Sequence, residues 1–135
     1  MARFLSGAWV EDFNRALSDV EVPAPASDAA LAARDGRFSM CQIVSDGPDG
    51  DVRATLRVAD GRVRMTLDDG DDADVAISLS WDDAVAMGTG SLAATDAIAA
   101  GRVRVRGDLA VLAEAQAVLA AVSPQLAALR ASTGY

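Results

Sequence analysis

Between residues 37 and 79 the sequence alternates apolar and polar side chains in four short runs, at residues 37–45, 51–59, 62–67 and 74–79. Short segments that are typical of turns separate the runs: Asp-Gly-Pro-Asp-Gly, Asp-Gly, and an acidic stretch. A period of two places alternate side chains on opposite faces of a β-strand. The pattern therefore predicts an antiparallel meander of four strands, and this is the feature that most constrains the fold.

The two faces of this predicted sheet differ in chemistry. One face is apolar and carries Val52, Ala54, Leu56, Val58, Val63, Met65, Leu67, Val75, Ile77 and Leu79. The opposite face is polar and carries Arg53, Thr55, Arg57, Arg62, Arg64 and Thr66. An antiparallel sheet with this pattern has one dry face and one solvated face, so other elements must cover the apolar side.

A fifth strand is predicted at residues 102–106, where arginine and valine alternate between two glycines. Val103 and Val105 would face the core, and Arg102, Arg104 and Arg106 would join the polar face. The 135 residues suit a single domain over residues 1–135. We therefore predict an α+β fold with a five-stranded, mostly antiparallel sheet and helices on one face.

Helical spacing of apolar residues predicts the covering elements. Residues 5–18 form an amphipathic pattern, and Glu11, Asp12, Asn14, Arg15 and Ser18 take its solvent side. A second, short helical turn is predicted to begin at Ser27 and to end near Asp35-Gly36. Ser80 is placed to cap a helix that ends at residues 88–90, and another helical piece runs over residues 92–100.

The last helix is predicted to follow Gly107-Asp108. Its buried side is expected to carry Leu109, Leu112, Leu119 and Val122. Ser123-Pro124 then starts a further helical turn, because serine caps helices and proline suits the first helical position.

Composition excludes several classes of function. The net charge of −8 opposes binding to nucleic acid, and the absence of histidine and lysine removes the commonest catalytic bases, so we predict no enzyme activity. A single cysteine excludes an internal disulfide. No signal peptide and no charge-free run of 18 apolar residues is present, so we expect a cytoplasmic protein without integral membrane insertion.

Two charged features are interpreted as solvated surface. The acidic run at residues 68–74 resembles a cation loop but lacks the spacing and closing glutamate of an EF-hand, so a solvated turn is favoured and no metal is predicted. The arginine face could bind acidic headgroups or an acidic partner, but exposed arginines that pair with aspartate are the favoured interpretation.

The predicted helices carry mostly alanine toward the sheet: Ala84, Ala97, Ala99, Ala100, Ala113 and Ala117. Either these helices approach the sheet closely, or an apolar cavity remains. An empty cavity is destabilising, so a retained one would indicate a lipophilic ligand. Composition alone favours close packing.

Five segments in a fixed order resemble the sterol carrier protein two family, and most of all its small single-domain actinobacterial members. They are Asp74–Ser80, Asp82-Asp83-Ala84, Gly88–Leu92, Ala97–Gly101 and Arg102–Asp108. The resemblance implies a five-stranded sheet, helices on one face, an apolar tunnel between them, and binding of sterols, fatty acids or acyl chains. The chain departs from the family at Ile98 and Ala99, where members often carry a bulky Phe-Met pair, and this changes the shape of the expected pocket.

The leading hypothesis is therefore a non-enzymatic protein, without cofactor, that binds a hydrophobic small molecule or lipid. We expect the ligand-binding residues to be Met65, Ile77, Leu79, Trp81, Ala84, Met87, Leu92, Ile98, Val103, Val105 and Leu112. The alternative is an interaction or dimerisation module of the same fold with a filled core, acting as a homodimer or on another protein.

Overall fold

The computed structural model describes residues 3–21, 37–48, 50–59, 61–68, 70–89 and 91–134. The strands are β1 (Phe38–Gly47), β2 (Gly50–Ala59), β3 (Arg62–Thr66), β4 (Val75–Ser80) and β5 (Arg104–Gly107). The helices are α1 (Gly7–Ala16), α3 (Trp81–Gly88), α4 (Ala94–Ala99), α5 (Leu109–Val122), the 3-10 helix η1 (Ser123–Leu126) and α6 (Ala127–Ser132). The turn predicted between Ser27 and Gly36 lies outside the described residues.

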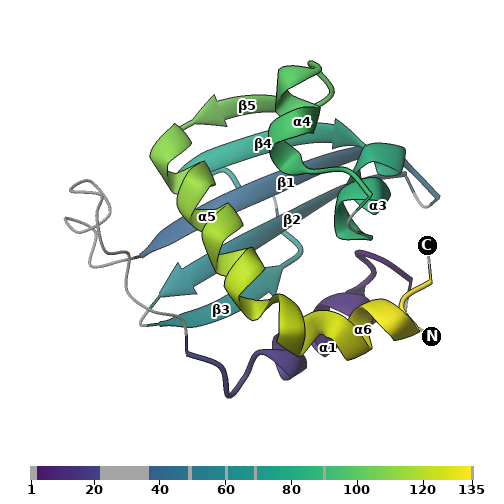
Figure 1. Ribbon diagram of the computed structural model, residues 1–135, viewed down its shortest axis with the longest axis vertical. Helices are drawn as coiled ribbons and strands as arrows, with labels where there is room; N and C mark the ends of the chain where they lie inside the picture. Colours follow the sequence, from purple (N-terminus) through teal and green to yellow (C-terminus); the bar gives the residue numbers. More distant parts are fainter. Residues whose placement is uncertain are drawn as a thin grey trace.

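One sheet holds the five strands in the order β3-β2-β1-β4-β5, and the helices lie on one of its faces (Figure 1). The predicted α+β fold is thus confirmed. The four-stranded meander is wrong at its last step, because β4 does not pair with β3. It pairs in parallel with β1, with Met40 opposite Val75 and Ser45 opposite Ser80, while the other neighbouring strands are antiparallel.

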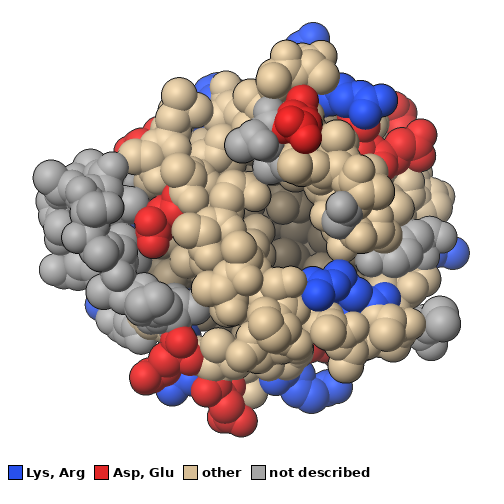
Figure 2. All heavy atoms as spheres, in the orientation of Figure 1, with Lys and Arg blue, Asp and Glu red and all other residues tan. Residues whose placement is uncertain are grey.

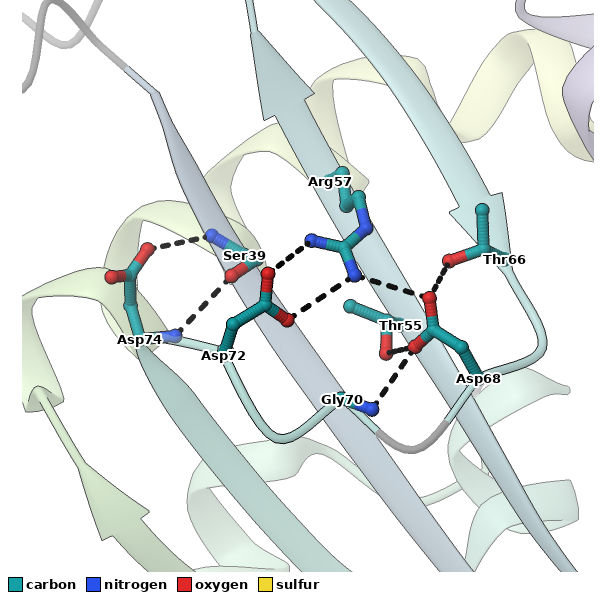
Figure 3. A network of polar contacts seen from close by, with 8 residues as sticks. All are labelled: Ser39, Thr55, Arg57, Thr66, Asp68, Gly70, Asp72 and Asp74. Carbon is teal, nitrogen blue, oxygen red and sulfur yellow. Dashed lines mark hydrogen bonds and ion pairs between the residues drawn. The ribbon is translucent and has the colours of Figure 1, made fainter.

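The connection from β3 to β4 crosses the back of the sheet, and Figure 3 shows the contacts that hold it there. Asp68 accepts hydrogen bonds from the hydroxyls of Thr55 (2.7 Å) and Thr66 (2.8 Å). It also forms an ion pair with Arg57 (3.1 Å). Arg57 also reaches Asp72 at 3.4 Å. The acidic run is therefore docked on β2 and β1 and does not form a hairpin turn between neighbouring strands, although the side chains of Asp68 and Asp72 are exposed as expected.

At its far end the same connection is fixed to β1. The carboxylate of Asp74 accepts from the backbone N–H of Ser39 (2.9 Å), and the backbone N–H of Asp74 donates to the Ser39 hydroxyl (3.2 Å). The docked segment buries part of the face that was predicted to be wet, because Thr55 is 0% and Cys41 1% exposed. Burial raises the pKa of the Cys41 thiol.

Helix α1 begins at Gly7 rather than at residue 5, since Leu5 has a φ of 62° and the Ser6 side chain caps the helix. Asn14 was predicted to face solvent, but it joins the outer edge of β3. Its amide donates to the carbonyl of Met65 at 2.9 Å and its oxygen accepts from the Met65 N–H at 2.7 Å. A side chain thus satisfies backbone groups that an edge strand leaves open.

The helix after β4 follows the prediction. The Ser80 hydroxyl accepts from the backbone N–H of Asp83 at 3.2 Å, and α3 ends at Gly88. The next helix, α4, is shorter than predicted, and Gly101 follows it with a φ of 75°. Arg102 precedes β5 and pairs with Asp83 of α3 at 3.7 Å, so it does not lie with the arginines of the back face.

Helix α5 crosses the sheet and buries Val111, Leu112, Ala115, Val118 and Val122. The prediction for Leu109 was wrong, because this residue is 66% exposed at the first turn, where the Asp108 side chain caps the helix. Pro124 occupies the first turn of η1 as expected, but Ser123 makes no capping bond there.

Residues Leu109–Ser132 form a continuous helical stretch of 24 residues, with a mean hydropathy of 1.4 in its most apolar window. By length and composition alone it could cross a membrane, a test that the buried helices of globular proteins also pass. The sequence criterion of a charge-free run did not select it, because it contains Glu114 and Arg130.

The two ends of the chain lie side by side (Figure 1). Arg3 and Gly134 form an isolated parallel bridge, and the backbone N–H of Phe4 donates to the Gly134 carbonyl at 2.8 Å. The indole N–H of Trp9 donates to the Thr133 hydroxyl at 2.9 Å, and Thr133 in turn donates to the Leu129 carbonyl. These bonds fix α1 beside α6.

Candidate functional site

A cavity of about 570 Å³ lies between the apolar face of the sheet and the helices. Figure 2 shows its opening as a hollow in the helix-covered face, with basic side-chain atoms at the rim. Comparison with Figure 1, drawn in the same orientation, places the hollow between α5 and α3, above the middle of the sheet. The helices therefore leave space above the sheet rather than packing closely on it.

Several elements contribute to the wall of this cavity. The sheet supplies Gln42, Met65 and Leu79, and α3 with the residues after it supplies Ala84, Met87, Gly88, Thr89, Leu92 and Ala93. The N-terminal segment supplies Phe4, Leu5, Trp9 and Phe13. The C-terminal helices supply Gln116, Leu119, Ala120, Ser123, Leu126, Leu129 and Arg130.

Helix α5 carries two different stripes. Its buried residues pack on the sheet, whereas Gln116, Leu119 and Ala120 line the cavity, together with Ser123 at the start of η1. The spacing of three and four residues between these positions places them on one face of the helix. The same helix thus packs on the core with one face and forms a cavity wall with the next.

An aromatic cluster in the N-terminal segment forms part of the cavity wall. The ring of Phe4 packs edge-on against Trp9, with a centroid separation of 5.0 Å, and lies 5.6 Å from the ring of Trp81. Trp9 also packs against Phe13 at 5.5 Å. Trp81 belongs to this aromatic cluster but is not part of the cavity wall.

The structure brings five of the sequence-predicted ligand-binding residues together along the cavity: Met65, Leu79, Ala84, Met87 and Leu92. The other six lie outside its wall: Ile77, Trp81, Ile98, Val103, Val105 and Leu112. Ile77, Val103 and Leu112 are buried in the core. Val105 is half-buried, and Ile98 is 37% exposed.

Sequence reasoning missed the contribution of both chain ends. Leu5, Trp9 and Phe13 belong to the amphipathic pattern predicted at residues 5–18, but the sequence does not specify what its apolar side packs against, and Phe4 was not part of that pattern. Gln42 was also missed, although its spacing from Met40 and Val44 already places it on the apolar face of β1.

Five of the described residues in the cavity wall have polar side chains: Gln42, Thr89, Gln116, Ser123 and Arg130. Gln42 lies on the sheet and Gln116 on α5, while the Thr89 hydroxyl already donates to the Val85 carbonyl at 2.9 Å. Arg130 is the one charged residue among the wall residues that the structure describes, and its guanidinium donates to the Ser123 carbonyl at 3.1 Å. Such a lining favours an apolar ligand with a small polar part.

Among the cavity-lining residues that the structure describes, none is acidic and none is histidine or cysteine. Among the described residues, no cluster of three or more histidine, cysteine or acidic side chains could hold a metal ion. The chemistry available in the cavity is thus apolar contact together with hydrogen bonds from two amides, two hydroxyls and a guanidinium.

A model of the SCP-2 sterol transfer family matches residues 13–120 of the chain. The apo form of Sterol Carrier Protein 2 from Yarrowia lipolytica is a similar solved structure, with 18% identity, a TM-score of 0.61, and coverage of 88% of this chain and 92% of that one. Palmitated SCP2L2 from Aedes aegypti has 15% identity, a TM-score of 0.56, and coverage of 82% and 90%. A comparison with curated protein sequences gave no match.

The same fold also occurs within a larger enzyme. The inverting sec-alkylsulfatase Pisa1 from Pseudomonas sp. matches 61% of this chain with 19% identity and a TM-score of 0.50. This chain spans only 13% of the length of that enzyme. At such identities the structural likeness establishes the fold.

Proposed function

Because the chain belongs to the SCP-2 sterol transfer family, we propose that it binds a hydrophobic small molecule, such as a sterol, a fatty acid or an acyl chain, in the cavity between sheet and helices. The observation that carries the proposal is the cavity of about 570 Å³ with its mostly apolar wall. Ligand sites in proteins have volumes of roughly 300–1,000 Å³.

Apolar burial would supply most of the binding free energy, at about 0.8 kcal/mol for each methylene removed from water. Met65 and Met87 line opposite parts of the wall, one from the sheet and one from α3. Methionine side chains adapt to ligands of different shape, which suits a site for flexible chains as well as for rigid rings. The mechanism is binding, and no chemical step on the ligand is proposed.

The filled-core module is the less favoured function. It requires a cavity below about 300 Å³, the lower end of the range for ligand sites. The volume of about 570 Å³ argues for a ligand instead. Homodimer formation remains a prediction.

Blocking the cavity tests the proposal. Ala120 is exposed and lines the cavity, whereas Ala117 is exposed on the same helix outside the wall. We expect Ala120→Phe to lower the affinity for palmitic acid at least about tenfold, because the ring would occupy ligand volume. Ala117→Phe, the matched control, is expected to bind like the wild type.

Two measurements read out this experiment. Native mass spectrometry of freshly purified protein, with lipid extraction, detects a retained ligand, and tryptophan emission follows titration, because Trp9 lines the cavity. Equal binding by the two variants would place the ligand elsewhere. A wild-type protein that retains no lipid and gives no change in emission would overturn the proposed function.

A further inference from the structure

Gln42 occupies the middle of the otherwise apolar sheet face. On β1 it lies between Met40 and Val44, both 0% exposed, on the same face of the strand. Its cross-strand partners are Ala54 on β2 and Ile77 on β4, which are both buried. An amide side chain therefore stands at the centre of the cavity floor, where apolar residues surround it within the sheet.

The Gln42 amide has no hydrogen-bond partner among the described residues. In the described residues, every fully buried side-chain nitrogen or oxygen has a hydrogen-bond partner, so an amide without a partner must be accessible. The amide atoms of the half-buried Gln42 are thus accessible, and the space above this face of the sheet is the cavity that Gln42 lines.

This arrangement has a different consequence for each kind of ligand. A hydrocarbon chain that covered Gln42 would remove water from the amide and give nothing in return, which is unfavourable. A ligand oxygen at the same place would restore the lost hydrogen bond. An amide both donates and accepts, so it can bind a hydroxyl or a carboxyl group.

We propose that Gln42 is a specificity-determining residue that hydrogen-bonds to a hydroxyl or carboxyl oxygen of the ligand at the floor of the cavity. This inference rests on the proposed function, because it concerns the same cavity. It adds that the ligand does not present only hydrocarbon to the sheet: a polar atom of the ligand lies against β1, and the apolar body fills the space toward the helices.

The test combines changes in the protein with changes in the ligand. Affinities of palmitic acid, 1-hexadecanol and the matched hydrocarbon heptadecane are measured by displacement of a fluorescent fatty acid, for the wild type and for Gln42→Leu. Loss of one hydrogen bond is expected to weaken binding of the acid, the alcohol or both about fivefold to tenfold. Binding of heptadecane is expected to stay equal or to become tighter.

Two further variants control for packing. Gln125→Leu makes the same substitution at an exposed residue of η1 outside the cavity wall, and it is expected to change none of the affinities. Gln42→Met keeps the length of the side chain and is expected to behave like Gln42→Leu. Ligand-free Gln42→Leu is expected to unfold at the same or a higher urea concentration than the wild type, whereas a structural role for Gln42 predicts a lower one.

The outcomes separate this inference from the proposed function. If the wild type binds ligands but Gln42→Leu and Gln42→Met retain full affinity for both the acid and the alcohol, the inference is wrong and the proposed function stands. A uniform loss for all three ligands would likewise overturn it, since that indicates a change of cavity shape. Absence of binding by the wild type would overturn both the inference about Gln42 and the proposed function. The acid and the alcohol, compared with each other, identify the oxygen that Gln42 recognises.

Discussion

Asp68 shows how a single exposed side chain can hold a chain crossing in place. Its carboxylate accepts from Thr55, Thr66, the backbone N–H of Gly70 and Arg57 (Figure 3). Hydrogen bonds from the two threonine hydroxyls, helped by the Arg57 charge, lower the pKa of Asp68 to about 2. Protonation of the Asp68 carboxylate weakens or breaks each of these hydrogen bonds and the ion pair with Arg57.

The lowered pKa of Asp68 leads to a prediction on stability and pH. An unperturbed aspartate has a pKa of about 3.9, so the stabilisation by ionised Asp68 is complete above about pH 5 and is lost as the pH falls toward 2. We expect the difference in free energy of unfolding between the wild type and Asp68→Asn to shrink over this range. Urea unfolding at several pH values measures it, and parallel curves for the two proteins would contradict the assignment.

At the scale of elements, the β3–β4 connection depends on a close approach at Gly70. This glycine has a φ of 61°, and a Cβ atom there would lie 2.5 Å from the sulfur of Cys41 and 2.8 Å from the Thr55 hydroxyl oxygen. Those atoms belong to the back face of β1 and β2. A side chain at position 70 would lift the connection away from the sheet that it covers.

We therefore expect Gly70→Ala to lower the free energy of unfolding by about 1–3 kcal/mol through overpacking, in addition to backbone strain. Gly50→Ala is the matched control, because Gly50 also has a positive φ, of 98°, but open space around it. It reports the cost of backbone strain alone, about 1–2 kcal/mol. Chemical denaturation compares the two, and equal losses would show that the close approach at Gly70 is unimportant.

At the scale of the whole molecule, the chain ends complete the cavity. Phe4, Trp9 and Leu129 lie in its wall, and the bonds of Trp9 and Thr133 join the segments that carry them. The family match covers residues 13–120, so parts of this wall lie outside the matched region. The cavity belongs to the complete fold and cannot be assigned to the sheet and α3 alone.

A ligand that binds only the folded protein stabilises all of it by mass action. At a free ligand concentration of one hundred times Kd, the gain in free energy of unfolding is about 2.7 kcal/mol. We expect the Tm of delipidated protein to rise continuously with palmitic acid concentration, and Ala120→Phe to show a smaller rise. Differential scanning calorimetry measures both effects. If binding of palmitic acid is detected by another method but the Tm does not change, a site inside the folded core is contradicted.

The sequence by itself determined the strands, the principal helices and the polarity of the two sheet faces. Alternation such as that of Val75, Ile77 and Leu79 is a local property, and so is capping by Ser80. Met65, Leu79, Ala84, Met87 and Leu92 could be placed near a cavity because they follow from the sheet face and the helix next to it. The segments that resemble the family also predicted the fold class.

Only the tertiary structure decided the pairing of β4 with β1, the docking of Asn14 on β3 and the part that both chain ends play in the cavity. Each of these depends on contacts between residues far apart in the chain. Residues 67–74 were compatible with a hairpin turn or with a crossing, because both kinds of strand pairing use the backbone N–H and C=O groups that nearly every residue carries, and the local side-chain pattern does not distinguish them. The exposure of Leu109 could not be predicted for the same reason. Its position in the helical pattern shows an apolar residue but not whether another element covers it.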